Sequence, residues 1–375
     1  MINMLENTKT YFPNLDSPRF FAFLLIFIRH VIYTQNPEIK NTSVYSFYNV
    51  HLNAGVLALD FYITLSGFLI TWIIIEEYEF TEKFNLLYFW QKRSLRILPL
   101  YFSLVALGYI MIWGARNYLG ETVNNIPPLP WLLTFTLNFY IIKHGQAFLF
   151  FIVFLWIISV QEQFYVLWGL VMKYLKKKLV PVCIFLIIAS LVFRIWAIHQ
   201  PQNLLFNSLS WIGNFAAGAL VALFCMRKGK IFSRLTDCPK WVSLLFYLLL
   251  AANILFFDNI YSSSLMIVPE RLIASLLFIF IIFEQSFVSR KLVEMGKSNL
   301  LNYLGRISYG LFCYHGLVIL LYERVMQQVT FTEKPLGVYL INPLIIFALT
   351  VIISALSYEY FEKPVMYLSY RNIEE

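Results

Sequence analysis

The sequence predicts an all-α, polytopic integral membrane protein of about ten transmembrane helices with cytoplasmic N- and C-termini. Of the 375 residues, 59% are hydrophobic and only 13% are charged, whereas a soluble domain has about 25% charged residues. The apolar residues form runs of about 20, the length that crosses a bilayer as a helix. The Lys and Arg residues gather in short clusters between these runs. We therefore expect the lipid bilayer to be the first partner and exclude an ordinary soluble globule.

Ten apolar runs are the predicted spans. Their approximate bounds are 20–34, 54–76, 96–113, 131–172, 179–198, 207–226, 241–257, 269–287, 303–322 and 339–361. The run 131–172 is too long for one straight crossing, and Lys143, His144 and Gly145 interrupt it. We expect a short re-entrant piece there, followed by one full helix.

The basic clusters predict the sidedness of the loops. With the N-terminus in the cytoplasm, the loops near 83–93, 173–178, 227–234 and 290–297 all lie inside, which satisfies the positive-inside rule. The net charge of +8 therefore reports topology, and we expect no nucleic-acid partner. No stretch longer than a loop remains, so we expect residues 1–375 to form one transmembrane domain without a separate soluble domain.

The four cysteines show no metal-ligand spacing, and no metal is expected. They are Cys183, Cys225, Cys238 and Cys313.

Arg19 and His30 lie on the same face of the first span. They are eleven residues apart, which is three helical turns plus about 20°, and about 16 Å along the axis. A neutral imidazole can take a proton from a hydroxyl near pH 7, so His30 is the natural candidate for a general base. The alternative is an interfacial histidine beside Arg29 that faces lipid headgroups.

Asp60 lies inside the otherwise apolar second span, where a carboxylate is costly unless it is paired. We expect it either to orient His30 or to pair with an arginine; a purely structural ion pair is the alternative. Ser66 and Gly67, near the middle of this span, favour close packing of two helices.

Cations gather where the third span begins. Arg93 and Arg96 are three residues apart, and Lys92 and Arg96 are four apart, so their side chains lie on adjoining faces of one turn. Guanidinium groups match phosphate oxygens, so this cluster can hold a phosphorylated ligand. The alternative is a set of topology charges that contact anionic lipid.

The segment 156–165 is the densest polar group within the apolar part of the chain. Ser159, Glu162, Gln163 and Tyr165 are neighbours at helical spacing. A glutamate inside the membrane favours a functional site, and a hydrogen-bonded network that packs helices is the alternative. His315, within the ninth span, could equally be a packing histidine.

The sequence resembles the acyltransferase-3 family of membrane acyltransferases from Leu15 to Pro364. The motifs occur in the family's order, and together they are specific. They are Arg19 with His30, Asp60 to Ile70, Lys92–Arg93 with Arg96 to Tyr101, Ser159 to Tyr165, Arg306 to Tyr309 with His315, and Tyr360 to Pro364.

This resemblance implies an O-acyltransferase that moves an acyl group, most often acetyl, from cytoplasmic acyl-CoA to a hydroxyl of a glycan or lipid-linked sugar. It places the protein in the cell's inner or plasma membrane. The implied catalytic residues are His30, Glu162 and Asp60, with Ser159, Gln163, Tyr165 and His315 as further candidates. The implied donor-binding residues are Arg19, Lys92, Arg93, Arg96 and Tyr101.

The chain departs from the family pattern in three ways. Gln161 replaces the first glutamate of a pair, which leaves Glu162 as the expected carboxylate. Trp211 and Asn214 stand where relatives often have Arg and Asp, which suggests a different acceptor. We expect no esterase-like domain of the kind that some relatives have, so that either this body completes the transfer or a separate periplasmic or extracellular esterase-like protein finishes it. A homo-oligomer is left open.

Two other functions compete with this interpretation. A secondary transporter would use Arg19, Asp60, Glu162 and His315 as a substrate or proton path and predicts paired broken helices, of which we find no convincing pair. A non-catalytic membrane scaffold or export partner predicts that loss of His30 leaves function intact.

Overall fold

The computed structural model is all-helical over the residues that it describes, which are 10–32, 34, 36–51, 54–120, 122–145, 149–326 and 334–366. A helix lies over every predicted span. The helices of the first half that match a predicted span are α2 (Asp16–Val31), α5 (Gly55–Thr81), α6 (Leu86–Tyr118) and α10 (Trp156–Tyr174). Those of the second half are α11 (Leu179–Trp196), α13 (Ser208–Met226), α15 (Lys240–Leu255), α18 (Glu270–Phe287), α20 (Ser308–Met326) and α21 (Asn342–Ser357).

Short helices connect these long ones. They are α3 (Pro37–Lys40), α4 (Ser43–His51), α7 (Leu129–Leu133), α8 (Leu137–His144), α9 (Phe150–Val153), α12 (Pro201–Phe206), α14 (Lys230–Thr236), α16 (Phe257–Ile260), α17 (Ser264–Ile267) and α19 (Asn299–Arg306). One-turn helices lie at Pro13–Leu15, Lys176–Lys178 and Met295–Lys297, and π-helical turns at Gly337–Ile341 and Tyr358–Glu362 flank α21.

Six helices in the described part of the chain are long and apolar enough to cross a membrane. Two bent pairs, α14 with α15 and α19 with α20, raise that number to eight if each pair is one span. The 16-residue α2, and α18 with its charged first turn, lie outside this set. The membrane character is thus supported, whereas the count of ten spans stays a prediction.

The region 131–172 has the broken form that the sequence suggested. Three short helices, α7, α8 and α9, precede the continuous helix α10, and a backbone of positive φ at Gly145 follows α8. Residues 146–148 lie outside the described residues. Each break leaves backbone N–H and C=O groups at the helix ends without partners in the helix. Such groups are tolerated at membrane depth only where other parts of the protein or water can bind them.

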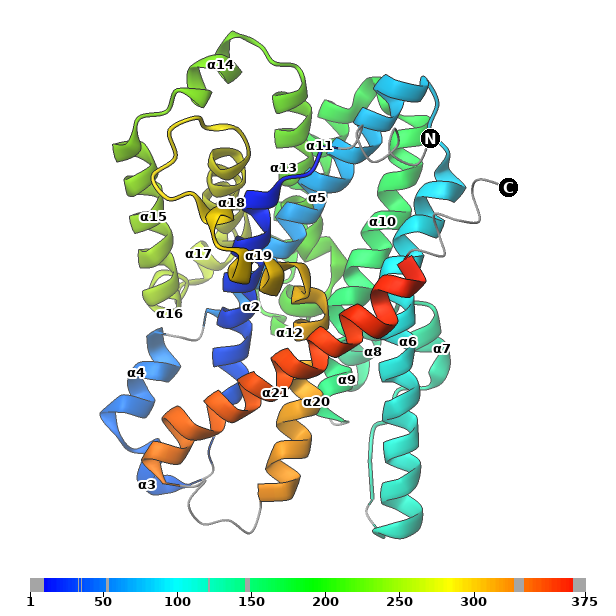
Figure 1. The fold of residues 1–375 in the computed structure, drawn as a ribbon, viewed down its shortest axis with the longest axis vertical. Helices are drawn as coiled ribbons and strands as arrows, with labels where there is room; N and C mark the ends of the chain where they lie inside the picture. The colour runs from blue at the N-terminus through cyan, green and yellow to red at the C-terminus, as the bar shows by residue number, and fades with distance from the viewer. Residues whose placement is uncertain are drawn as a thin grey trace.

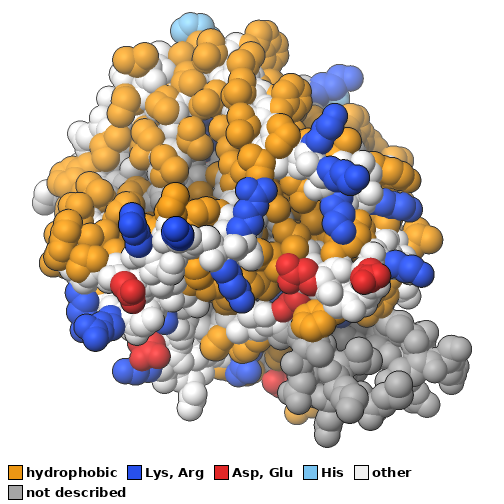
Figure 2. All heavy atoms as spheres, turned by 90° about the horizontal axis from the view of Figure 1, so that it is seen from above, with side chains coloured by type: hydrophobic (Ala, Val, Ile, Leu, Met, Phe, Trp, Pro, Cys, Tyr) orange, Lys and Arg blue, Asp and Glu red, His pale blue; other side chains and the backbone are white. Residues whose placement is uncertain are grey.

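The end of the molecule at α14 carries many positive side chains. In Figure 1, α14, which carries Lys230 and Arg234, lies at the opposite end from α3. Figure 2 looks onto that end and shows Lys and Arg side chains spread over a surface that is otherwise largely apolar. Because the chain ends, 1–9 and 367–375, lie outside the described residues, the cytoplasmic orientation of the termini stays a prediction.

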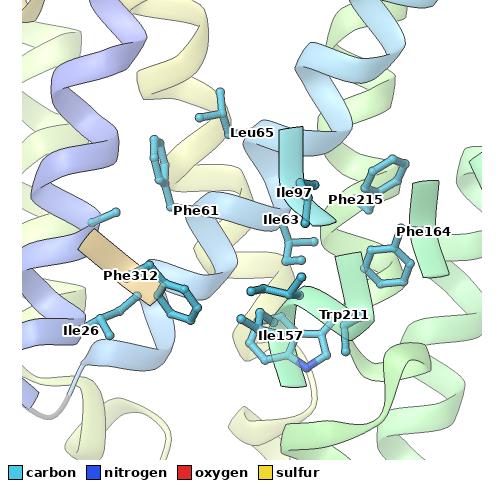
Figure 3. Packing of buried hydrophobic residues seen from close by; sticks show 14 of the residues in the cluster. Ile26, Phe61, Ile63, Leu65, Ile97, Ile157, Phe164, Trp211, Phe215 and Phe312 are labelled. Atoms are coloured by element: carbon cyan, nitrogen blue, oxygen red, sulfur yellow. The ribbon is translucent and has the colours of Figure 1, made fainter. Parts of the chain in front are cut away.

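Close packing of α5 against α13 forms the centre of the fold. A Cβ added at Gly67 would lie 2.0 Å from the Phe215 carbonyl oxygen, and one at Gly218 would lie 1.9 Å from the Thr64 carbonyl oxygen. Only glycine permits this approach, as the packing interpretation of Ser66–Gly67 expected. Buried side chains from α5, α6, α10, α13 and α20 continue the core around this contact, among them Ile63, Ile97, Ile157, Phe215 and Phe312 (Figure 3).

Candidate active site

A cavity with arginine side chains lies between α2, α5, α6, α10 and α20. We call it the inner compartment. Arg19 of α2 and Arg93 and Arg96 of α6 contribute its cations, while Leu65, Ile97, Ile157 and Phe312 are among its apolar walls. Its other polar side chains are Tyr62, Ser66, Gln161, Tyr165, Ser308 and Tyr309. Arg19 of α2 and the Arg93–Arg96 turn of α6, which are distant in sequence, therefore share one space.

A second cavity adjoins the first, and we call it the mouth compartment. The two share Arg19, Arg93, Arg96, Leu69 and Tyr309 as lining residues. The further lining of the mouth compartment comes from the segment before α2 and the first residue of α2, from α5, from the last residue of α19, and from the helical turns after α21. These further residues are Thr10, Tyr11, Phe12, Asp16, Trp72, Ile73, Arg306, Tyr358, Glu362 and Met366.

The charges of these cavities are not balanced. Arg19 pairs with Asp16 across one turn of α2. Arg93, Arg96 and Arg306 form no ion pair with the residues that the structure describes, although Glu162 attracts Arg93 electrostatically. Four arginines thus line the two cavities together with two carboxylates, those of Asp16 and Glu362, and guanidinium groups in excess of carboxylates form a site for an anionic ligand.

His30 and His315 form a hydrogen-bonded pair near the inner compartment. His30 Nδ1 lies 3.2 Å from His315 Nε2, although the two residues are 285 positions apart. His315 is completely buried, and its Nδ1 lies 2.5 Å from the carbonyl oxygen of Phe312. The sequence had left His315 open between a functional and a packing residue, and the structure places it beside the predicted base.

The Phe312 carbonyl determines the tautomers of this pair. A carbonyl oxygen only accepts, so His315 Nδ1 donates to it, and a neutral His315 then has Nε2 as its acceptor. His30 Nδ1 must donate to that nitrogen. In neutral His30 the basic lone pair therefore lies on Nε2.

Aromatic rings enclose the two imidazoles. The Phe154 ring lies 4.3 Å from the His30 ring and 4.7 Å from the His315 ring, centroid to centroid. This approach requires a glycine after His315, because a Cβ at Gly316 would lie 2.6 Å from the Phe154 ring. The stacked ring can also stabilise an imidazolium by a cation–π contact.

Phe312 joins the pair to the arginine cavity. Its side chain forms part of the inner compartment wall, while its carbonyl holds His315 one helical turn later. His30 itself is not among the residues that line either compartment. The geometry thus offers an anion site at one end of α2 and a candidate base at the other, about 16 Å apart along the helix.

Asp60 lies on the side of α5 that faces away from the cavity. It accepts hydrogen bonds from Arg271 Nη1 at 3.1 Å and from Asn214 Nδ2 at 2.7 Å, and it is completely buried. The Arg271 guanidinium stacks on the Trp211 ring at 3.4 Å. Of the two expected roles, pairing with an arginine is the one that this structure shows. A catalytic part for Asp60 stays a prediction.

The remaining candidates on α10 differ in what their side chains contact. Tyr165 lines the inner compartment and donates to Ser66 at 3.4 Å. Glu162 is buried, and its Oε1 has no hydrogen-bond partner among the described residues. The Ser159 hydroxyl donates a long hydrogen bond of 3.5 Å to the Leu155 carbonyl, four residues earlier.

Gln163 takes part in a network that ties α10 to its neighbours. Its Nε2 donates to the Phe135 carbonyl at 2.6 Å and to Asn138 at 3.0 Å, and its amide oxygen accepts from Ser208. These bonds match the helix-packing alternative for this residue.

Two residues predicted to bind the donor lie apart from the arginines. The Tyr101 hydroxyl donates to the Leu132 carbonyl at 3.0 Å in a fully buried position. The Lys92 ammonium lies 5.4 Å from the Tyr88 ring centroid. Neither is among the lining residues of the two compartments, because both point to other faces of α6. Their part in donor binding stays a prediction.

A second set of buried charges was not predicted from the sequence. Arg194 of α11 pairs with Glu270 of α18 at 2.9 Å and donates to Ser210 at 2.8 Å. Arg271 follows Glu270 directly and pairs with Asp60. An arginine inside an apolar span was the available signal, since such a residue requires a partner.

Comparison with known proteins identifies the family. The family model described as "Acyltransferase domain" matches residues 12–359. O-acetyltransferase OatA of Staphylococcus aureus strain NCTC 8325 / PS 47 is 26% identical over 377 residues, covering 95% of this chain, and OatA of strain COL gives the same values. The chain spans 57% of the length of these relatives. No solved structure matches.

The described residues contain no group of three or more His, Cys, Asp or Glu side chains that could hold a metal ion. The family model covers nearly the whole length of this chain, which also contains the arginine-lined cavity and the buried histidine pair. The chain therefore belongs to the acyltransferase-3 family.

Proposed function

We propose that this membrane acyltransferase moves an acyl group, acetyl in the first instance, from cytoplasmic acyl-CoA to a hydroxyl of a glycan acceptor. Arg19, Arg93 and Arg96 hold the phosphates of the donor, and His30 is the general base. The name O-acetyltransferase of the similar proteins supports acetyl transfer to oxygen.

One observation carries this proposal. The wall residue of the arginine cavity, Phe312, also fixes the tautomer of the histidine pair through its carbonyl. A single residue thus connects the wall of the anion site with the histidine pair, across the roughly 16 Å of α2 that separate Arg19 from His30. An acyl thioester anchored by its phosphates can extend toward His30 through this region.

The chemical step follows from the position of the lone pair. His30 Nε2 accepts the proton of the acceptor hydroxyl while the oxygen attacks the thioester carbonyl carbon. The new C–O bond forms, the C–S bond breaks, and the proton passes from His30 to the leaving thiolate. His315 stabilises the imidazolium by accepting from its Nδ1–H, and the Phe154 ring face adds to this.

The acceptor class rests on the family resemblance. A cell-surface or exported polysaccharide, or a lipid-linked sugar, presents hydroxyls outside the cytoplasm, and His30 lies at the end of α2 remote from Arg19. We place the protein in the inner or plasma membrane, with the mouth compartment toward the cytoplasm and the basic loops. A separate extracytoplasmic esterase-like partner and self-association remain proposals.

The secondary-transporter alternative is not favoured, because the chain matches an acyltransferase family over residues 12–359. The scaffold alternative makes the opposite prediction for His30 and is tested directly below.

The test uses the full chain in detergent and measures acetyl-CoA binding by calorimetry together with transfer of labelled acetyl to a soluble glycan. Arg93→Ala/Arg96→Ala should lose binding by about 100-fold, since each charge-assisted contact contributes about 1.5–3 kcal/mol. His30→Ala should keep binding and lose transfer. His315→Phe retains an aromatic ring but loses the acceptor nitrogen, and transfer should fall with binding unchanged.

Arg234→Ala/Arg290→Ala is the control for charge, because it likewise removes two arginines, both exposed and both outside the two compartments. It should bind as the wild type does. Absence of acetyl-CoA binding by folded wild type would overturn the donor proposal. Full transfer by His30→Ala would remove His30 as the general base, and absence of transfer by folded wild type, with cellular function kept by His30→Ala, would support a scaffold. A trapped acyl-histidine would replace direct attack by a two-step route.

A further inference from the structure

The mouth compartment contains a cation that the proposed function does not use. Arg306 ends α19, its side chain is exposed, and it forms no ion pair with the residues that the structure describes. It lines only the mouth, whereas Arg93 and Arg96 line both compartments. The anion site therefore has two parts. Arg93 and Arg96 lie where the two compartments meet, and Arg306 lies in the mouth compartment alone.

The helix break beside Arg306 adds to the positive potential. The chain bends by 69° between α19 and α20. Ser308 and Tyr309, the first residues of α20, line the inner compartment. The N-terminal end of a long helix carries a partial positive charge and favours phosphate groups.

Tyr11 lies across the mouth with its ring 61% exposed. Its hydroxyl donates to Asp16, which also holds Arg19. Burial, followed by the hydrogen bond and the charge of Asp16, raises the pKa of Tyr11 to about 12, so the side chain stays a neutral phenol at working pH. Arg306 lines the same compartment as Tyr11, which places the two side chains around one space.

The carboxylates of the mouth are already engaged. Asp16 accepts from Tyr11 and pairs with Arg19, and Glu362 accepts from Ser357 at 2.9 Å. Arg306 thus remains available for a ligand anion. An exposed aromatic ring beside an available guanidinium is a combination that can bind a nucleobase and a phosphate together.

We propose that the mouth compartment binds the nucleotide half of the donor, with Arg306 pairing the 3′-phosphomonoester of the ribose and the Tyr11 ring stacking on the adenine. This inference rests on the proposed function and deepens it. Arg93 and Arg96, at the junction, hold the diphosphate. The mainly apolar inner compartment takes the pantetheine arm, whose thioester then points toward the histidine pair.

Calorimetry with acetyl-CoA and with acetyl-dephospho-CoA, which lacks only the 3′-phosphate, tests this assignment on the full chain. Wild type should bind acetyl-CoA about tenfold more tightly, the effect of one charge-assisted contact. Arg306→Ala should bind both ligands equally, at the wild-type affinity for the dephospho form. Arg93→Ala/Arg96→Ala should bind both ligands more weakly and keep the wild-type preference for acetyl-CoA over acetyl-dephospho-CoA.

Tyr11→Ala should weaken both ligands about equally, because both contain adenine, whereas Tyr11→Phe should bind as wild type. Arg290→Ala, an exposed arginine outside both compartments, controls for a general loss of positive charge. An unchanged preference in Arg306→Ala, or equal weakening of both ligands by it, would overturn the assignment of Arg306. Wild-type binding by Tyr11→Ala would overturn the stacking contact. Failure of wild type to bind either ligand would instead remove the donor proposal itself.

Discussion

Two groups of arginines flank α5, and they differ in how their charges are balanced. On the α13 and α18 side, Arg271 pairs with Asp60 and Arg194 pairs with Glu270. On the cavity side, Arg93 and Arg96 have no ion-pair partner in the described part of the chain. A paired arginine in the membrane interior is a structural clamp, whereas converging arginines without partners prepare a site for an anion.

The paired group should respond most strongly in stability. Arg271→Ala leaves the Asp60 carboxylate buried without its cation, which should cost about 3–5 kcal/mol in the free energy of unfolding. Thermal or denaturant unfolding in detergent measures this. Asp60→Leu/Arg271→Leu removes both charges and should lose less than the single variant. An equal or larger loss in the double variant would show that the unpaired Asp60 carboxylate is not the cause of the loss.

The close contact between α5 and α13 should show the next largest loss of stability. Gly218→Ala places a Cβ 1.9 Å from the Thr64 carbonyl oxygen, and forcing α5 and α13 apart should cost about 1–3 kcal/mol. Gly114→Ala is the matched control, because nothing lies within 4 Å of its added Cβ in α6. That variant should be neutral or slightly more stable. A destabilised Gly114→Ala with an unaffected Gly218→Ala would contradict the close contact.

Salt should separate the two groups further. Acetyl-CoA affinity should fall about tenfold between roughly 0.05 and 0.5 M NaCl, because the mouth arginines are reached by solvent ions. The unfolding free energy that depends on Arg271 should change little over the same range, since that pair is buried. Titration calorimetry and unfolding at each salt concentration test both statements. Parallel salt dependence of the two quantities would remove the distinction.

The smallest change in the free energy of unfolding should come from Arg93 and Arg96, measured in the absence of ligand. Arg93→Ala/Arg96→Ala breaks no ion pair with the described residues and relieves repulsion between like charges. The unfolding free energy should therefore stay within about 0.5 kcal/mol of the wild-type value. A loss as large as that of Arg271→Ala would mean that these arginines also hold the fold together.

Helical periodicity and hydropathy were sufficient to place a helix over every predicted span and to break the region 131–172 before α10. They also put Arg19 and His30 on one helix face, because that relation depends only on residues within one helix. The number of true crossings stayed a prediction, because a 16-residue helix such as α2 and a charged helix such as α18 do not meet the length and composition of a free span.

The candidate site was predictable only in part. His30 and the Arg93–Arg96 turn follow from local spacing and from the family resemblance. The contact of His30 with His315 does not, because 285 residues separate the two rings and no periodicity relates one helix to another. Asp60 had two expected partners, and the choice of Arg271 over His30 came from the packing of α5 against α13 and α18.

By itself, the sequence determined which segments are helices, which ends of them carry positive charge and which polar residues lie at a cost among apolar ones, because these are local properties of the chain. The tertiary structure alone decided which arginine has a carboxylate and which faces a cavity, and which ring nitrogen of His30 is basic. Those properties depend on distances between side chains of different helices, and distances of that kind are set by packing.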